Sequence, residues 1–304
     1  MQKETTQNMS NRNMKDILAK TVKTGIIKSN LIPMFAGLTL ALYTYGLNPL
    51  EKIPGILFSI IGTASVIASA GVFNNLYDRD IDAIMERTKN RPTVTEEIHP
   101  KTAMFLGCLL AVIGIGALFR ATPLAALLGF IGLFFYIGPY TMWSKRKTVY
   151  NTEIGSISGA MPPLIGWAAM YPDVTHPAII GLFIVMVIWQ MPHFYSIAIS
   201  KYDDYKAASV PMLPVVKGFK RTYRQTNFYL IILIATSFLF YTLSLGLTLV
   251  SLILGIIWLI LNNSSSRKQD QQKWASSMFV YSLIYMTILF STVIIYSIMG
   301  MIFG

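Results

Sequence analysis

The sequence predicts an all-α protein that crosses a membrane many times and forms one bundle of transmembrane helices. Of its 304 residues, 54% are hydrophobic and only 13% are charged, whereas about a quarter of the residues of a typical soluble domain are charged. The mean hydropathy of +0.53 is also positive. These values exclude an ordinary soluble domain and indicate a polytopic membrane protein.

Apolar segments long enough to cross a bilayer, about 17 to 25 residues each, recur nine times along the chain. They lie near 25–47, 54–75, 102–119, 122–140, 152–171, 177–198, 227–245, 247–261 and 276–299. The polar residues 1–22 lack the apolar core of a signal peptide. We therefore expect a cytoplasmic tail over 1–22 and a transmembrane domain over 23–304. The tail is also unlike a mitochondrial presequence, which favours a bacterial plasma membrane.

The basic residues test this count independently of hydropathy. All but Lys52 and Arg120 fall in the tail, at the entry to the first span, or in the loops after the second, fourth, sixth and eighth spans. Loops rich in Lys and Arg stay in the cytoplasm, so we expect a cytoplasmic N-terminus and an external C-terminus. The net charge of +11 is then explained by topology, and no nucleic acid is expected as a partner. The single cysteine, Cys108, excludes an intrachain disulfide and is expected to pack within an apolar span.

Three polar side chains with a regular spacing lie at the end of the second span, in the pattern Asn74-x3-Asp78-x3-Asp82. On an α-helix this spacing keeps the three side chains within about 80° of one face. A stripe of oxygen atoms suits Mg²⁺, which prefers carboxylate ligands and completes its shell with water and substrate phosphates. The alternative reading is a solvated helix end.

Further polar clusters are predicted on the same cytoplasmic side. Basic and aromatic residues follow the second and fourth spans: Arg87, Arg91, Tyr140, Trp143, Lys145 and Arg146. A third group ends the sixth span: Trp189, His193, Lys201, Asp203, Asp204 and Lys206. Because a diphosphate needs cations as well as a metal, the spacing suggests one Mg²⁺-diphosphate site shared by two halves of the bundle. The alternatives are a topology signal for the basic run, an interfacial belt for the Trp residues and a structural hydrogen bond for His193.

The run from Asn74 to Pro92 resembles the first aspartate motif of the UbiA superfamily of intramembrane prenyltransferases. Three further stretches agree, namely Tyr140–Arg146, Asn151–Trp167, and Trp189–Phe194 continuing to Pro214. The run Trp-Gln-Met-Pro-His-Phe within the last stretch is similar to the haem-farnesylating branch, the protohaem IX farnesyltransferases. The resemblance covers residues from about 20 to 300 of the chain.

This resemblance implies nine helices around a central cavity open to the cytoplasm, with Mg²⁺ as cofactor. It implies transfer of the farnesyl group of farnesyl diphosphate to a vinyl group of haem B, with addition of water, giving haem O and diphosphate. The implied metal and catalytic residues are Asn74, Asp78, Asp82, Asp203 and Asp204. The implied or candidate substrate-binding residues are Lys145, Arg146, Arg87, Arg91, Tyr77, Tyr140, Trp143, Trp189, His193, Lys201 and Lys206. A haem A synthase acting downstream is a candidate partner.

The chain departs from this pattern at three places. Asp203–Asp204 is an adjacent pair where the quinone-forming relatives have Asp-x3-Asp, Tyr140 precedes Lys145 by one residue more than in their Tyr-x3-Lys, and Lys23–Thr24 replaces a Lys-Pro pair. The rival functions are prenylation of an aromatic quinone precursor, secondary transport through intramembrane carboxylates, and an assembly role beside an oxidase.

Overall fold

The computed structural model describes residues 12–264 and 270–303. Every regular element in this part of the chain is a helix, so the predicted all-α class is confirmed. The first half contains α2 (Met14–Thr21), α3 (Thr24–Thr44), α4 (Ile53–Tyr77), α5 (Arg79–Ile84), α6 (Pro100–Ala121), α7 (Pro123–Phe135), the π-helix η1 (Tyr136–Ser144) and α8 (Lys145–Lys147). The second half contains α9 (Asn151–Gly159), α10 (Met161–Met170), α11 (Pro177–Ser200), α12 (Tyr202–Ala207), α13 (Leu213–Thr236), the short η2 (Ser237–Phe240), α14 (Leu245–Asn262) and α16 (Gln271–Phe303).

Seven helices in the described residues are long and apolar enough to cross a membrane. Two predicted spans fall outside this set. The segment 152–171 is divided between α9 and α10, and the segment 227–245 runs from α13 through η2 to the start of α14. The chain is thus a multi-pass membrane protein, and the count of nine spans stays a prediction.

The break between α9 and α10 has a local cause. Pro162 and Pro163 stand in the first turn of α10, where the missing proline N–H is tolerated. In a continuous helix each proline would remove a backbone hydrogen bond and clash with the preceding turn. The chain therefore ends α9 at Gly159 and starts again at Met161, as expected from the two prolines in the sequence.

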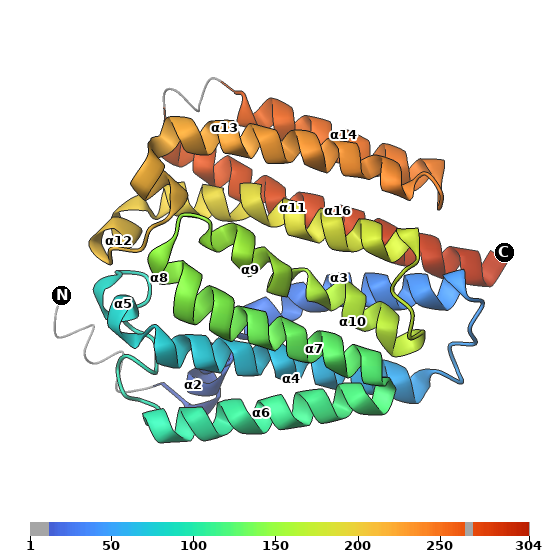
Figure 1. The fold of residues 1–304 in the computed structure, drawn as a ribbon, viewed down its shortest axis with the longest axis horizontal. Helices are drawn as coiled ribbons and strands as arrows, with labels where there is room; N and C mark the ends of the chain where they lie inside the picture. Colours follow the sequence, from blue (N-terminus) through green and yellow to red (C-terminus); the bar gives the residue numbers. More distant parts are fainter. Residues whose placement is uncertain (1–11, 265–269, 304) are drawn as a thin grey trace.

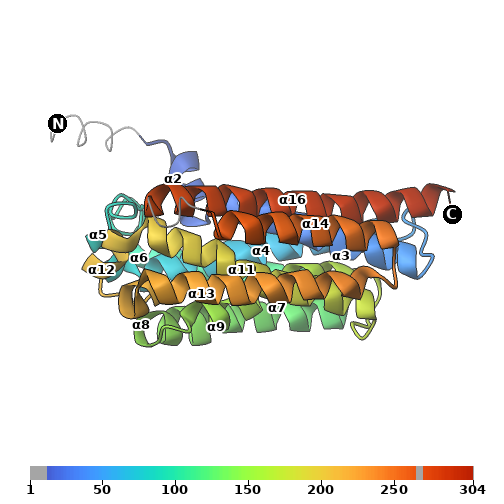
Figure 2. The ribbon, with the colours of Figure 1, turned by 90° about the horizontal axis from the view of Figure 1, so that it is seen from above.

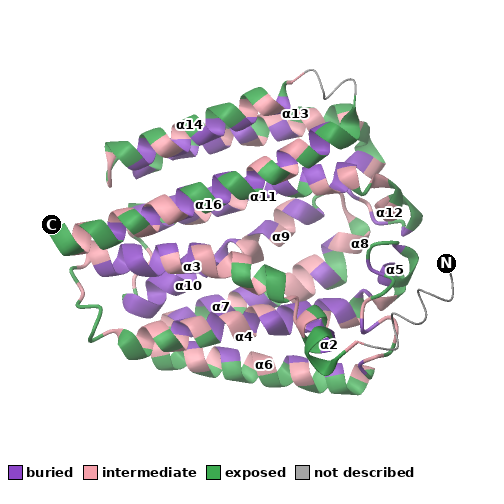
Figure 3. Ribbon diagram, turned by 180° about the vertical axis from the view of Figure 1, so that it is seen from behind, coloured by how far each residue is buried: buried purple, intermediate pink, exposed green. Residues whose placement is uncertain are grey.

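The helices surround a common interior (Figures 1 and 2). Helices α3, α4, α7, α10, α11 and α16 contact one another around it, while α6 packs outside α4 and α14 packs against α13 and α16. Every residue of α10 is buried, and Figure 3 shows α10 and α11 mostly buried while exposed residues mark the outer side of α6. The free Cys108 lies within the apolar helix α6, as expected, but its side chain is exposed on the outer side of that helix and does not pack against other helices of the bundle.

The end of the bundle that carries α5, α8 and α12, on the left in Figure 1, is called the polar end. The N-terminal helix α2 is held there by Asn75, whose Nδ2 donates to Thr21 O at 3.0 Å, and by Arg12, whose guanidinium pairs with Glu97 at 3.0 Å. The predicted boundary between tail and transmembrane domain falls at the junction of α2 and α3. At that junction Lys23 adopts a left-handed backbone conformation with φ of 57°, which turns the chain from α2 into α3.

Candidate active site

Asn74, Asp78 and Asp82 lie together at the polar end, although not on one continuous helix. Helix α4 ends at Tyr77, α5 begins at Arg79, and Asp78 stands between them. Helical hydrogen bonds nevertheless continue across the junction, from Asp78 N to Asn74 O at 2.9 Å and from Asp82 N to Asp78 O at 2.8 Å. All three side chains are buried, with exposed fractions of 4%, 0% and 1%. The stripe predicted from the spacing is therefore present as a bent but connected row.

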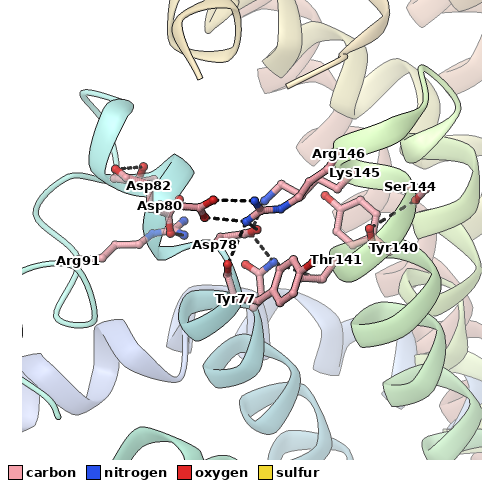
Figure 4. Close-up of polar contacts among 12 residues, drawn as sticks. Tyr77, Asp78, Asp80, Asp82, Arg91, Tyr140, Thr141, Ser144, Lys145 and Arg146 are labelled. Atoms are coloured by element: carbon pink, nitrogen blue, oxygen red, sulfur yellow. Dashed lines mark hydrogen bonds and ion pairs between the residues drawn. The ribbon is translucent and has the colours of Figure 1, made fainter. Parts of the chain in front are cut away.

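Each member of this row is paired with a cation. Lys23 donates to Asn74 Oδ1, Lys145 pairs with Asp78, and Arg91 pairs with Asp82. Asn74 Nδ2 in turn donates to Asp78 Oδ2 at 2.7 Å and to Thr141 at 3.2 Å. Figure 4 shows the contacts of Asp78 and Asp82, with η1 facing the end of α4. Buried carboxylates require such partners, because an isolated buried charge is strongly destabilising.

In each of the two aspartates of the row, one carboxylate oxygen has no hydrogen-bond partner in the part of the chain that the structure describes. Asp78 Oδ1 and Asp82 Oδ1 are buried and have no hydrogen-bond partner among the described residues. The Arg146 guanidinium lies 3.7 Å from Asp78 Oδ1, which is beyond hydrogen-bond distance. Unpaired buried oxygens of this kind call for a missing partner, and two of them in one row suit a hard cation.

The donor set fits Mg²⁺ only in its phosphate-bound form. No group of three or more His, Cys, Asp or Glu side chains forms a metal-binding cluster in the part of the chain that the structure describes. Mg²⁺ at phosphate sites, however, is usually held by one or two carboxylates together with water and phosphate oxygens. Asp78, Asp82 and Asn74 can provide that partial shell, and a phosphate ligand would have to provide the rest.

The π-helix η1 accounts for the unusual spacing between Tyr140 and Lys145. Pro139 lies inside η1, and the backbone N–H of Lys145 donates to Tyr140 O, five residues earlier. A π-helical turn holds one residue more than an α-helical turn, and such turns are frequent at functional sites. The extra residue between Tyr140 and Lys145 is thus absorbed, and both side chains face the same cavity. The Tyr140 ring lies over Gly155, where a Cβ atom would stand only 2.7 Å from the ring.

A cavity of about 840 Å³ extends from this row into the bundle. Its polar end is lined by Lys23, Asn74, Asp82, Arg87, Arg91, Tyr136, Tyr140, Lys145, Lys201 and Tyr205. Its inner part is lined mainly by apolar residues of α4, α7, α10, α11 and α16, among them Val66, Leu133, Met161, Ile165, Trp189, Phe194, Phe279, Leu283 and Met286. The cavity therefore joins a cationic end to an apolar interior. The predicted substrates need both, because the diphosphate group requires cations and the farnesyl chain requires apolar surroundings.

His193 lies on the α11 side of this cavity. Its ring stacks on Trp189 with centroids 4.5 Å apart and on Phe279 with centroids 5.3 Å apart. Its Nδ1 lies 2.7 Å from Ser282 Oγ, and that hydroxyl donates to Phe279 O. Since the serine proton is already used, Ser282 must accept from Nδ1–H, and this tautomer leaves a lone pair on Nε2.

Other predicted residues lie outside the cavity lining. Arg146 forms two hydrogen bonds of 2.7 Å to Asp80, which lower the pKa of that carboxyl to about 2, and its guanidinium lies over the Tyr77 ring. Trp143, Asp203 and Lys206 are exposed. Asp204 is half-buried, and its Oδ1 accepts from Glu86 N at 3.2 Å. The contact between α12 and the loop after α5 brings the two acidic regions to the same end of the bundle, as the sequence predicted. Of the two aspartates on α12, Asp204 is the one that forms this hydrogen bond.

The cavity lining also includes polar residues that were not among the predicted site residues, and Lys23, Tyr136, Gln190 and Tyr205 are four of them. Lys23 is the most informative of them. Burial, followed by the neighbouring cations Arg91 and Lys145, holds the pKa of Lys23 well below its ordinary value. The sequence did contain a signal for Gln190, since a polar side chain deep in a transmembrane span is rare without a role.

Comparisons with known proteins agree with this geometry. Residues 30–284 match the UbiA prenyltransferase family. Protoheme IX farnesyltransferase 1 of Bacillus cytotoxicus is 67% identical over 96% of this chain and 96% of its own length. Protoheme IX farnesyltransferase of Shouchella clausii is 61% identical over 94% and 92%. A solved UbiA homologue from Archaeoglobus fulgidus, bound to GPP and Mg²⁺, shares the fold with a TM-score of 0.65 at 15% identity, covering 90% of this chain and 99% of its own.

The family match covers most of the chain, and the two bacterial relatives match it nearly from end to end. The chain is therefore a prenyltransferase of the UbiA family and belongs, within it, to the protohaem IX farnesyltransferases.

Proposed function

We propose that this protein transfers the farnesyl group of farnesyl diphosphate to a vinyl group of haem B, with Mg²⁺ as cofactor and addition of water, to give haem O and diphosphate. The observation that carries the proposal is a cavity that joins a cation-lined end to an apolar interior. The names of the relatives at 67% and 61% identity support the choice of substrates.

The diphosphate is held at the polar end. Lys23, Lys145 and Arg91 stand around the row of oxygen ligands, and Arg87 and Lys201 also line the cavity there. Arg and Lys form strong, charge-assisted hydrogen bonds to phosphate oxygens. Asn74, Asp78 and Asp82 would hold Mg²⁺, which would neutralise charge on the leaving diphosphate. The UbiA homologue from Archaeoglobus fulgidus that is bound to GPP and Mg²⁺ supports the choice of Mg²⁺ as cofactor.

The farnesyl chain occupies the apolar part of the cavity between α4, α7 and α10. There the reacting carbon is sheltered from bulk water, which would otherwise capture the allylic cation. Tyr140 lines the cavity and is placed to face that cation with its ring. Tyr77 and Trp143, the other two aromatic residues among the candidate substrate-binding residues at this end, are exposed, so we assign the role to Tyr140.

Haem B occupies the side of the cavity formed by α11 and α16. Trp189 and Phe279 offer ring faces to the macrocycle, and His193 presents the lone pair of Nε2. We therefore assign His193 to orienting the porphyrin, with its iron as the natural partner of an imidazole nitrogen.

The orientation in the membrane follows from charge. The polar end carries the basic loops after α4, η1 and α11, so we place it in the cytoplasm, with the C-terminus outside. Farnesyl diphosphate and Mg²⁺ then enter from the cytoplasmic side, and haem O leaves through the bilayer toward an enzyme that oxidises it further, for which a haem A synthase is the candidate.

The test is product formation by the purified protein in lipid nanodiscs with farnesyl diphosphate, with and without Mg²⁺. We expect haem B to be converted to haem O only when Mg²⁺ is present. Farnesylation of 4-hydroxybenzoate in place of haem B would identify an enzyme for quinone precursors. Transport without any prenylated product would identify a transporter, and the absence of both would leave an assembly role.

A further inference from the structure

The side chain of Gln190 lies in the apolar part of the cavity and has an unused hydrogen-bond acceptor. Its exposed fraction is 5%, and it lines the cavity. Its Nε2 donates to Ser156 O at 3.0 Å and to Met186 O at 2.9 Å. Oε1 has no donor within hydrogen-bond distance anywhere in residues 12–264 and 270–303.

The orientation of this amide is fixed by its surroundings. Exchanging the amide oxygen and nitrogen would direct Oε1 at two carbonyl oxygens, which cannot donate. Gly159, at the end of α9, leaves the room that the amide occupies, since a Cβ there would meet Gln190 Oε1 first and would come within 2.8 Å of Cδ. The end of α9 thus makes a place for the glutamine amide, whose oxygen lies beside Gly159 with its acceptor positions unused.

We propose that Gln190 Oε1 binds the water molecule that ends the reaction, an inference that rests on the proposed function. The vinyl π electrons form a bond to C1 of the farnesyl chain while the C1–O bond breaks and its electrons leave with the diphosphate. The positive charge then lies on the vinyl carbon next to the pyrrole ring. The water oxygen forms a bond to that carbon, and its spare proton passes to the diphosphate released in the same turnover.

The position of Gln190 matches this role. It precedes His193 by three residues on α11, so both side chains point to the same face of the helix, where the haem is placed. An apolar cavity holds an ordered water only where polar partners fix it. Without a bound water, the cation would instead lose a proton from the neighbouring carbon and form an alkene, and the product would be lighter by one water.

The ratio of hydroxylated product to alkene separates a water-binding role from a packing role. The experiment uses the full-length protein in nanodiscs with farnesyl diphosphate, Mg²⁺ and haem B in water enriched in ¹⁸O, with products resolved by mass spectrometry. In wild type we expect one ¹⁸O in the product. In Gln190→Met we expect the ratio to fall at least about tenfold, because a lost hydrogen bond to a reacting group changes a barrier by about 1.4 kcal/mol or more.

Gln225→Met is the matched control. Gln225 also braces helices with its amide, donating to Glu153 Oε1 and Tyr195 Oη at 2.9 Å, but it is not among the residues that line the cavity. We expect Gln225→Met to keep the wild-type ratio of hydroxylated product to alkene, even if its total rate of turnover changes. An unchanged ratio in Gln190→Met, together with haem O formation by wild type, would overturn the role of Gln190 alone. Failure of the wild type to farnesylate haem would overturn the proposed function itself.

Discussion

The two acidic regions at the polar end, Asp78 with Asp82 and Asp203 with Asp204, differ in how far their side chains are buried and held in place by hydrogen bonds and ion pairs. Asp78 and Asp82 are buried, and each already has one oxygen paired with a cation and one oxygen free. Asp203 is exposed and Asp204 is half-buried on the short helix α12. The first region is therefore held in place by the fold. In the second region, Asp204 accepts a hydrogen bond from the backbone of Glu86, and Tyr205 packs against the apolar cluster that includes Ile81 and Met85.

This difference has a physical consequence for binding. Groups that are already oriented and desolvated need little rearrangement when a charged ligand arrives, and preorganised electrostatics of this kind contribute most to catalysis. Exposed carboxylates are screened by water and pay conformational entropy when they are ordered. We therefore expect the first region to dominate turnover, with graded effects for the residues around it.

The largest effect is expected from Asp78→Asn and Asp82→Asn. Each substitution removes a negative charge from a buried row and leaves Lys145 or Arg91 without its partner. We expect kcat/KM for haem O formation to fall by about 10²- to 10³-fold, the range found when one preorganised group is removed from a charged transition state. The rates are measured over a range of Mg²⁺ concentrations in nanodiscs.

Glu96→Gln is the control for this pair. Glu96 is a carboxylate at the same end, with a side chain 74% exposed and paired with Arg79. Because exposed ion pairs contribute little, we expect its rate to stay within about twofold of wild type. A loss in Glu96→Gln as large as that in Asp78→Asn would show that overall charge at the polar end, and not the buried row, is what matters.

Lys23→Met is expected to have the second largest effect. Lys23 is the cation that reaches the row from the junction of α2 and α3, so its removal should weaken diphosphate binding more than it slows the chemical step. Hydrogen bonds to charged groups contribute about 1.5 to 3 kcal/mol, which corresponds to a rise in the KM for farnesyl diphosphate of about 10- to 150-fold.

Lys20→Met provides the comparison for Lys23, because its side chain is exposed on α2 three residues earlier. It should leave the KM for farnesyl diphosphate near the wild-type value. Equal KM values in both variants would remove Lys23 from the diphosphate site and would leave the row with only Lys145 of α8 and Arg91 of the loop after α5 as its paired cations.

The first acidic region could be predicted from sequence because it depends on local geometry. A spacing of four residues specifies one face of a helix, and this holds even where the helix bends at Asp78. Likewise the apolar segments, and the two prolines in the first turn of α10, specify local structure through neighbouring residues in the chain. The all-α class and most of the helix positions therefore followed from composition and spacing.

Lys23 and Gln190 could not be assigned in the same way, because their roles depend on distant contacts. Lys23 reaches Asn74 only because α2 is fixed by Asn75 and by the ion pair between Arg12 and Glu97. Gln190 is oriented by the carbonyl of Ser156, which belongs to another helix. Such contacts join residues that are far apart in the sequence, so a local pattern can mark Gln190 as unusual in its span but cannot show what either side chain contacts.

The smallest effect is expected in the second acidic region, where the structure separates two adjacent carboxylates. Asp204 accepts a hydrogen bond from Glu86 N and precedes Tyr205, which lines the cavity, so Asp204→Asn should lower kcat/KM by about tenfold, as expected for loss of one charge-assisted hydrogen bond. Asp203 is exposed, and Asp203→Asn should change kcat/KM by no more than about twofold. Measuring the rates of the two variants in parallel shows which of the two carboxylates contributes to turnover.

A loss in Asp204→Asn as large as that in Asp78→Asn would contradict this ranking. In that case α12 must close over the bound diphosphate and bring the Asp204 carboxylate to the metal, and the two acidic regions would contribute equally in the substrate complex.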